Sequence, residues 1–173
     1  MKQLTILGLL ILAIGAVSVN AAPPELQTPS PVIYLADNLD EQDKLGWCID
    51  TLGRGLSEEL QTHSCKPQGG DVQFAFNTDS QQIYSVEYAG KCATLNQPAA
   101  VGVTFDLLDC SDSELQKFSY NSERMEFSPR TNSDLCITAG AESRSAGPFM
   151  SRDLKLEVCA ATEASFKQWI IAE

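Results

Sequence analysis

Six cysteines are the residues in this chain whose spacing most clearly indicates chemistry. They recur along the chain as three pairs: Cys48 with Cys65, Cys92 with Cys110, and Cys136 with Cys159. The repeat favours three disulfides with this pairing. Each closes a short loop and should stabilise the folded state by about 3 kcal/mol, on a model-dependent account. Zinc is the competing interpretation, but no Cys-x-x-Cys occurs and a single histidine cannot complete three sites. We therefore predict three disulfides and no metal site.

The other reactive side chains form no recognisable catalytic set. His63 is the only histidine, and the sequence has no Gly-x-Ser-x-Gly motif, no His-Glu-x-x-His motif and no phosphate-binding loop. Carboxylates are plentiful, but a glycosidase needs two of them across one cleft. The acidic run at residues 37–43 lacks the glycine and terminal glutamate of a helix-loop-helix calcium site, so we interpret it as a solvated turn. We expect no enzymatic activity and no cofactor.

Charge and the amino-terminal segment limit the partners and the location of the protein. The net charge of −11 disfavours nucleic acid and anionic membrane surfaces as partners. Residues 1–21 combine Lys2, an apolar run and a small-residue end at Ala21, which is typical of a cleaved signal peptide. An uncleaved anchor is less favoured, because the run is shorter than the roughly 20 residues that span a bilayer and prolines follow at once. We expect a secreted protein, extracellular or periplasmic, with a Pro-rich segment at residues 22–31 and one domain at residues 32–173.

The cysteine pairs belong to a longer repeat that is built from short strands. Each copy ends in an aromatic-centred apolar triplet: Phe74-Ala75-Phe76, Phe118-Ser119-Tyr120 and Trp169-Ile170-Ile171. Short apolar runs between Gly, Asn, Asp and Ser predict four strands in each copy. The twelve expected strands are residues 32–36, 47–51, 60–63, 74–77, 83–86, 91–95, 105–108, 118–121, 125–128, 135–138, 154–158 and 169–171. Three such units favour a closed all-β barrel with pseudo-threefold symmetry, because closure removes the sheet edges.

The repeat resembles the ricin B-type β-trefoil lectin domain over residues 32–173. The resemblance is carried by Cys48-Ile49-Asp50, by the segment from Leu60-Gln61 to Cys65, and by Gly69-Gly70-Asp71-Val72-Gln73-Phe74. The Gln-x-Trp triplet of that family is degenerate, and only Gln116-Lys117-Phe118 keeps the glutamine with an aromatic residue. The resemblance implies a β-trefoil in which Phe74, Phe118 and Trp169 pack at the base of the barrel and bind no ligand.

The resemblance also implies one sugar pocket, in the first repeat. The family uses an aspartate two residues after the first cysteine to accept hydrogen bonds from sugar hydroxyls, and an aromatic ring two residues before the second cysteine. The first repeat has Asp50, Gln61 and His63 at matching positions, and Asp71 in the following turn. The corresponding residues are Thr94, Asp106 and Leu108 in the second repeat and Thr138, Lys155 and Glu157 in the third. Neither set offers both a carboxylate acceptor and a ring, so we expect a single pocket with an affinity in roughly the millimolar range.

Two functions are compatible with these residues. The first is a metal-independent lectin that recognises a galactose-type or related glycan through Asp50, Gln61, His63 and Asp71. The second is a trefoil whose sugar pockets have decayed and whose loops bind a separate protein, as a complex subunit, a toxin-like partner or a protease inhibitor.

Overall fold

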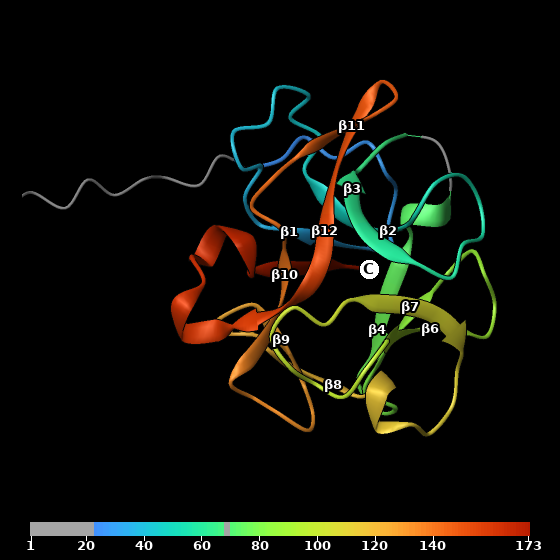
Figure 1. The fold of residues 1–173 in the computed structure, drawn as a ribbon. Coiled ribbons are helices and arrows are strands. Elements are labelled where there is room, and N and C mark those ends of the chain that lie inside the picture. The colour runs from blue at the N-terminus through green and yellow to red at the C-terminus, as the bar shows by residue number, and fades with distance from the viewer. Residues whose placement is uncertain (1–22, 68–69) are drawn as a thin grey trace, which may run out of the picture.

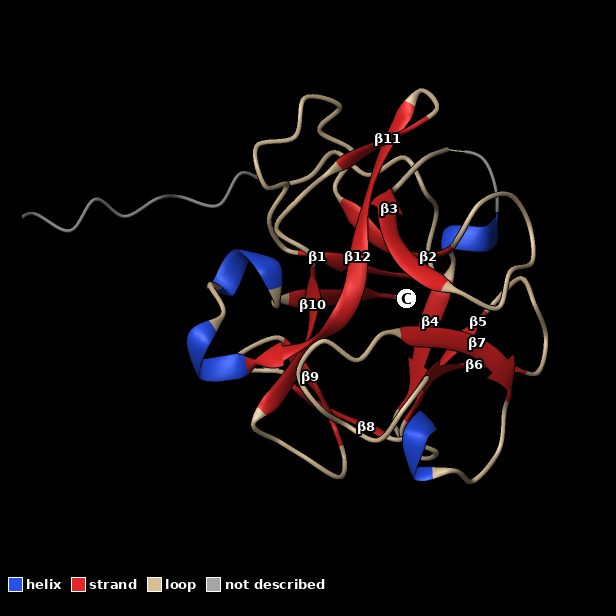
Figure 2. Ribbon diagram, viewed as in Figure 1, coloured by secondary structure: helices blue, strands red, loops and turns tan. Residues whose placement is uncertain are grey.

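The computed structural model describes residues 23–67 and 70–173, and the predicted signal peptide at residues 1–21 lies outside them. The regular secondary structure of this part of the chain is almost entirely β-strand, with four short 3-10 helices at the periphery (Figure 2). The strands are β1 (Val32–Leu35), β2 (Trp47–Thr51), β3 (Leu60–Ser64), β4 (Phe74–Asn77), β5 (Gln82–Ser85), β6 (Lys91–Leu95), β7 (Phe105–Asp109), β8 (Phe118–Asn121), β9 (Glu126–Pro129), β10 (Leu135–Ala139), β11 (Arg144–Ala146), β12 (Phe149–Val158) and β13 (Trp169–Ala172). The helices are η1 (Gly70–Val72), η2 (Glu114–Gln116), η3 (Cys159–Ala161) and η4 (Ala164–Phe166). None of the helices in the described residues is long and apolar enough to cross a membrane.

Strand pairing repeats three times along the chain. Antiparallel hairpins form between β2 and β3, β6 and β7, and β10 and β12. A second set of antiparallel pairs joins one repeat to the next, namely β4 with β5, β8 with β9, and the last strand β13 with the first strand β1. The chain therefore closes on itself with threefold pseudosymmetry (Figure 1), and the predicted β-trefoil is confirmed.

The core contains the aromatic residues that the repeat predicts. Phe74, Phe118 and Trp169 are fully buried in one apolar cluster, together with Trp47. The Trp169 indole Nε1 donates a hydrogen bond of 2.8 Å to the backbone oxygen of Ile137, so its one polar atom is satisfied inside the core. The packing role predicted for the three triplet aromatics is confirmed.

All six cysteines form the predicted disulfides, Cys48–Cys65, Cys92–Cys110 and Cys136–Cys159. The third disulfide encloses a longer segment, with a sequence separation of 23 against 17 and 18 in the first two. The additional residues of the third repeat lie between β10 and the part of β12 that pairs with it.

These additional residues explain the one difference from the predicted strands. The twelve expected strands are present, and their ends differ by no more than one residue except in β12, which begins at Phe149 instead of residue 154. The early part of β12 turns back at Gly147-Pro148 to pair with a thirteenth strand, β11. Gly147 has a φ of 69°, a left-handed conformation that favours glycine at this turn.

The β11–β12 hairpin of the third repeat lies beside the first repeat (Figure 1). Strand β12 pairs with β3, with Ser151 opposite His63 and Asp153 opposite Gln61. Arg152 anchors this contact, because its guanidinium stacks 4.4 Å from the centre of the Trp47 ring and donates to the backbone oxygen of Ala141 at 2.6 Å. The third repeat thus contributes a wall to the region where sequence predicts the site.

The described part of the Pro-rich segment, residues 23–31, packs on the first repeat. The backbone amides of Gln27 and Thr28 donate to the oxygen of Cys65 at 3.1 and 3.2 Å, and the amide of Glu25 donates to the oxygen of Lys44 at 2.7 Å. The segment therefore supports the back of the β2–β3 hairpin.

Candidate functional site

Strand register places the predicted site residues at equivalent points of the three hairpins. Asp50 pairs with Gln61 across β2 and β3. Thr94 pairs with Asp106 in the second repeat, and Thr138 pairs with Lys155 in the third, at the same register. The correspondence that the sequence implied between repeats is therefore present in the structure.

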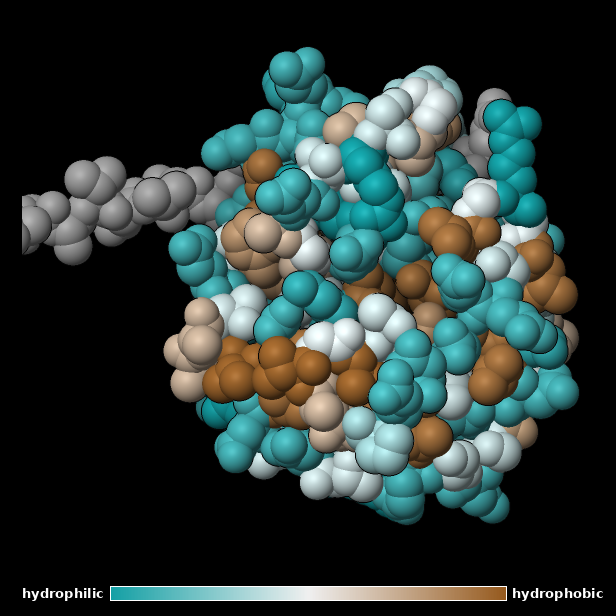
Figure 3. Space-filling model, viewed as in Figure 1, coloured by the Kyte–Doolittle hydropathy of each residue, from teal (hydrophilic) through white to brown (hydrophobic). Residues whose placement is uncertain are grey.

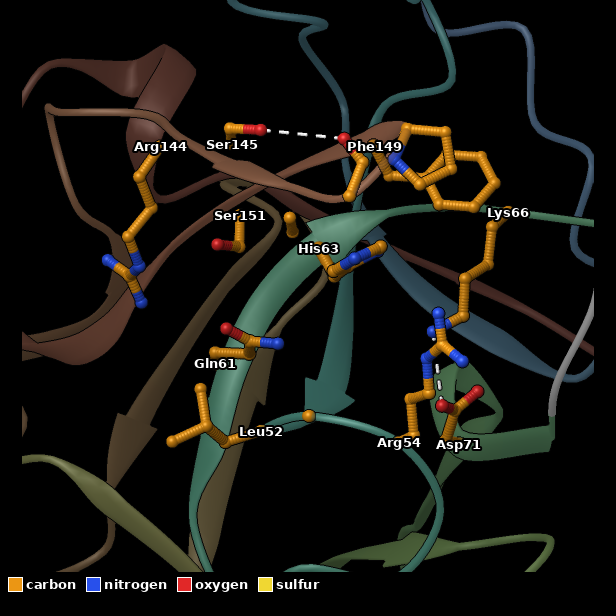
Figure 4. Close-up of a pocket in the computed structure, with 14 residues that line it drawn as sticks. Leu52, Arg54, Gln61, His63, Lys66, Asp71, Arg144, Ser145, Phe149 and Ser151 are labelled. Atoms are coloured by element: carbon orange, nitrogen blue, oxygen red, sulfur yellow. Dashed lines mark hydrogen bonds and ion pairs between the residues drawn. The ribbon is translucent and has the colours of Figure 1, made fainter.

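A cavity of about 720 Å³ opens in front of the first-repeat hairpin (Figure 4). Three of the four predicted site residues line it: Gln61, His63 and Asp71. Residues 52–54, which follow β2, and Lys66 add to this side. The opposite wall is residues 144–149 with Ser151, which come from the third repeat. The cavity is thus formed by two repeats, whereas the sequence predicted residues of the first repeat alone.

Asp50 lies beneath the cavity and is not one of its lining residues. Its side chain is 0% exposed, and neither carboxylate oxygen accepts a hydrogen bond from the residues that the structure describes. Burial raises the pKa of Asp50 to about 7, and the charge of Lys66 acts in the opposite direction. The structure therefore places Asp50 with the other three predicted residues, but below them.

Lys66 occupies the space between two carboxylates. Its ammonium Nζ lies 3.0 Å from Asp71 Oδ2 and 3.5 Å from Asp50 Oδ2, and its side chain is 12% exposed. Lys66 could not be identified from the sequence, because a lysine directly after a cysteine belongs to no motif. Lys66 lies between the two carboxylates only because η1 brings Asp71 back next to the β2–β3 hairpin.

A neutral His63 is favoured by its surroundings. Its Nδ1 donates to the backbone oxygen of Ser64 at 3.0 Å, because a carbonyl can only accept, and this leaves Nε2 of the neutral ring as an acceptor. Burial lowers the pKa of His63. The ring of Phe149 lies with its centre 5.7 Å from that of His63, at an interplanar angle of 63°. Phe149 is partly exposed and lines the cavity, so the third repeat supplies an aromatic ring next to His63.

A comparison between repeats explains why Asp50 has no hydrogen-bond donor. In the second repeat Gln116 is 2% exposed, and its Nε2 donates to Thr94 Oγ1 at 2.9 Å. The first repeat has Val72 where the second has Gln116, and Asp50 where the second has Thr94. A valine side chain cannot donate a hydrogen bond, so Lys66 takes the place of the missing amide as the polar group near Asp50.

In the other two repeats, side chains at or near the equivalent positions contact other residues of the chain. In the second repeat Gln116 packs against the hairpin, and its Nε2 also donates to the backbone oxygen of Asp109 at 2.9 Å. In the third repeat Lys155 and Glu157 form an ion pair at 2.6 Å. Gln61 and His63 of the first-repeat hairpin line the cavity of about 720 Å³, whereas Asp106 of the second repeat lines a smaller cavity.

A second cavity of about 380 Å³ adjoins the first. The two share Leu52, Gln61 and Arg144, and the second extends to Asp106 and Asn96 of the second repeat. A ligand longer than one sugar ring would have room to extend from one to the other.

Comparison with known proteins supports the fold. No family model matches the chain, and neither does any curated protein. Among solved structures, the agglutinin from Abrus precatorius is similar with a TM-score of 0.60 and 15% identity, over 85% of this chain and 48% of the agglutinin chain. The β-trefoil lectin of the Vibrio vulnificus hemolysin/cytolysin, solved with N-acetyl-D-lactosamine bound, is similar with a TM-score of 0.54 and 14% identity, over 82% of this chain and 91% of that one. GalNAc-T7, solved with UDP, GalNAc and Mn2+, is similar with a TM-score of 0.53 and 17% identity, over 87% of this chain and 23% of that one.

The chain therefore spans about half of the agglutinin chain and a smaller part of the transferase chain. At these identities the likeness concerns the fold alone, and that fold is the β-trefoil.

Proposed function

We propose that this β-trefoil is a secreted carbohydrate-binding protein that holds a galactose-type or related glycan in the first-repeat cavity. The observation that carries the proposal is the convergence of Gln61, His63 and Asp71 on one open cavity. Structural similarity to lectins, one of them solved with a bound disaccharide, supports the same function.

The cavity offers both kinds of contact that a sugar needs. Asp71 and Gln61 supply acceptors and donors for hydroxyl groups, and Ser151 adds a hydroxyl from the opposite wall. The apolar face of a sugar ring would pack on Phe149, which takes the part of the stacking ring that the sequence assigned to His63. Because side chains already provide these contacts, the binding that we propose requires no metal.

Asp50 acts indirectly in this proposal. It is covered by Lys66 and His63, so it sets the position of the Lys66 ammonium instead of touching the ligand. Residues 1–21 are proposed to direct export, and three disulfides suit an oxidising compartment.

A glycan array tests the proposal directly. Mature protein, residues 22–173 with disulfides intact, would be screened beside Gln61→Ala and Phe149→Ala. The matched control is Lys155→Ala, because Lys155 occupies the register position of Gln61 in the third repeat and lines neither cavity. We expect a galactose-type hit that both test variants lose and the control keeps. A hit that survives both test variants would place the site elsewhere.

The second candidate function, protein binding, rests on exposed apolar side chains near the cavity. Leu52 and Leu56, in the segment between β2 and β3, are 40% and 56% exposed. On the face drawn in Figure 3, apolar residues gather in a few small groups separated by polar ones. An array without any hit, together with co-purification of a protein that Leu56→Ser releases, would favour this function over the first.

A further inference from the structure

Basic side chains are concentrated around the first-repeat cavity. Its lining contains three of them, Arg54, Lys66 and Arg144, and one acidic side chain, Asp71. The whole chain has the opposite balance, with 12 basic and 23 acidic residues. If the lining were a random sample of the chain, it would contain more acidic than basic residues. The excess of basic residues in the lining therefore points to a ligand that carries negative charge.

The three cations differ in how far the protein neutralises them. Lys66 lies near Asp71 and Asp50, and Arg144 forms an ion pair with Asp153 at 2.6 Å. Arg54 forms no ion pair with any residue of the described part of the chain, and it is exposed at the cavity rim. Among the three cations of the lining, Arg54 is therefore the one most available to pair with an anionic group of a ligand.

The positions of these side chains suit a ligand with one anionic and one neutral end (Figure 4). Lys66 pairs with Asp71, and in Figure 4 Arg54 is at the same side of the cavity as these two residues. Gln61 and Ser151 lie between that side and Arg144. A guanidinium presents paired N–H donors that match the oxygens of a carboxylate or a sulfate, whereas a neutral hydroxyl uses only one donor.

We propose that the preferred ligand is an acidic saccharide whose carboxylate or sulfate group binds Arg54 and Lys66 while its neutral hydroxyls bind Gln61 and Ser151. This inference rests on the glycan-binding function proposed above and adds the chemical class of the glycan. The anion strengthens binding most at low ionic strength, because Arg54 is exposed and its field is screened by salt. Lys66 is screened less, since it is largely buried.

The test compares matched glycans that differ only in their charge. A galactose-terminated oligosaccharide, its sulfated form and its form capped with a carboxylate-bearing sugar would be titrated against the mature protein at about 20 and 500 mM salt. We expect the acidic forms to bind about tenfold more tightly at low salt, with most of this preference lost at high salt. A preference for the sulfated form alone, or for the carboxylated form alone, supports the inference and identifies the anion.

Variants connect the preference to the named residues. Arg54→Gln should remove most of the difference between acidic and neutral forms, because the anion loses its exposed guanidinium partner. The control is Arg130→Gln, which removes the same charge from an exposed arginine that pairs with Glu114 of the second repeat. Equal affinity for neutral and acidic forms would overturn the acidic preference and leave glycan binding intact. An absence of binding to all three forms would overturn both.

Discussion

The ionised form of Asp50 should destabilise the folded protein, and the substitution Asp50→Asn measures by how much. The carboxylate is fully buried, and its pKa is raised from 3.8 to about 7 because burial disfavours its charge. The folded state then holds this proton at pH values where the unfolded chain has lost it. Stability from this group is therefore present at acid pH and is lost as the pH rises from about 4 to 7.

The expected magnitude follows from these two pKa values. Between pH 8 and pH 5, the free energy of unfolding of the wild type should rise by about 2.5 kcal/mol relative to Asp50→Asn. His63, whose pKa is lowered, contributes an opposite trend below its usual pKa of about 6.5, but it is present in both proteins and cancels in the difference. Asparagine leaves a buried amide, so the absolute stability of the variant is less informative than the pH dependence of the difference.

Urea unfolding at pH 5, 6, 7 and 8 with disulfides intact provides the assay. The fluorescence of Trp47 and Trp169 reports unfolding, since both indoles are buried in the core. Asp79→Asn, a substitution at an exposed aspartate in the turn between β4 and β5, is the control and should give a difference that does not change with pH. A flat difference for Asp50→Asn as well would refute the reasoning, because it would mean that the buried carboxylate titrates as an ordinary one.

Three further results are expected. Lys66→Met should destabilise the protein by about 3 to 5 kcal/mol at pH 8 and by less at pH 5, measured by the same unfolding assay, because it leaves Asp50 and Asp71 without their shared cation. The affinity for a neutral galactose-terminated glycan should fall as the pH drops below about 6.5 and His63 gains a proton, and isothermal titration that finds the same affinity from pH 8 to pH 5 would remove His63 from the site. Replacing residues 144–148 by a short glycine turn should abolish glycan binding, because these residues form one wall of the cavity. The melting temperature should fall by only about 5 °C, because the residues are mostly exposed, and retained binding would show that the hairpin is dispensable.

Most of the fold could be predicted from the sequence because its signals are local and repeat three times. The alternation of apolar runs with turn residues predicts the strands, and the equal spacing of the cysteines predicts their pairing. Phe74, Phe118 and Trp169 could be assigned to the core because each closes a repeat at the same point. These features depend on neighbours within one repeat, so no three-dimensional information is needed.

The candidate site could be predicted from the sequence only in part, because two of its features arise between repeats. Trefoil closure brings β12 alongside β3, and this places Phe149 next to His63. The longer spacing between the last two cysteines, with Gly147-Pro148 inside it, could have indicated an extra hairpin, but its position over the first repeat could not be predicted from that spacing. The position of Lys66 above Asp50 likewise depends on the replacement of a glutamine by Val72, whose consequence is apparent only when the second repeat is superposed.

The most direct test of glycan binding by the first-repeat cavity is a titration of ¹⁵N-labelled mature protein with a galactose-terminated oligosaccharide, followed by amide chemical shifts. Millimolar affinity is well suited to this measurement, since binding and release are then fast. The largest shifts should fall on Gln61, His63, Asp71 and Phe149, and the amides of Lys155 and Glu157, which line neither cavity, should move little. Shifts centred on the second or third repeat, or no shifts up to about 20 mM ligand, would contradict the proposed function.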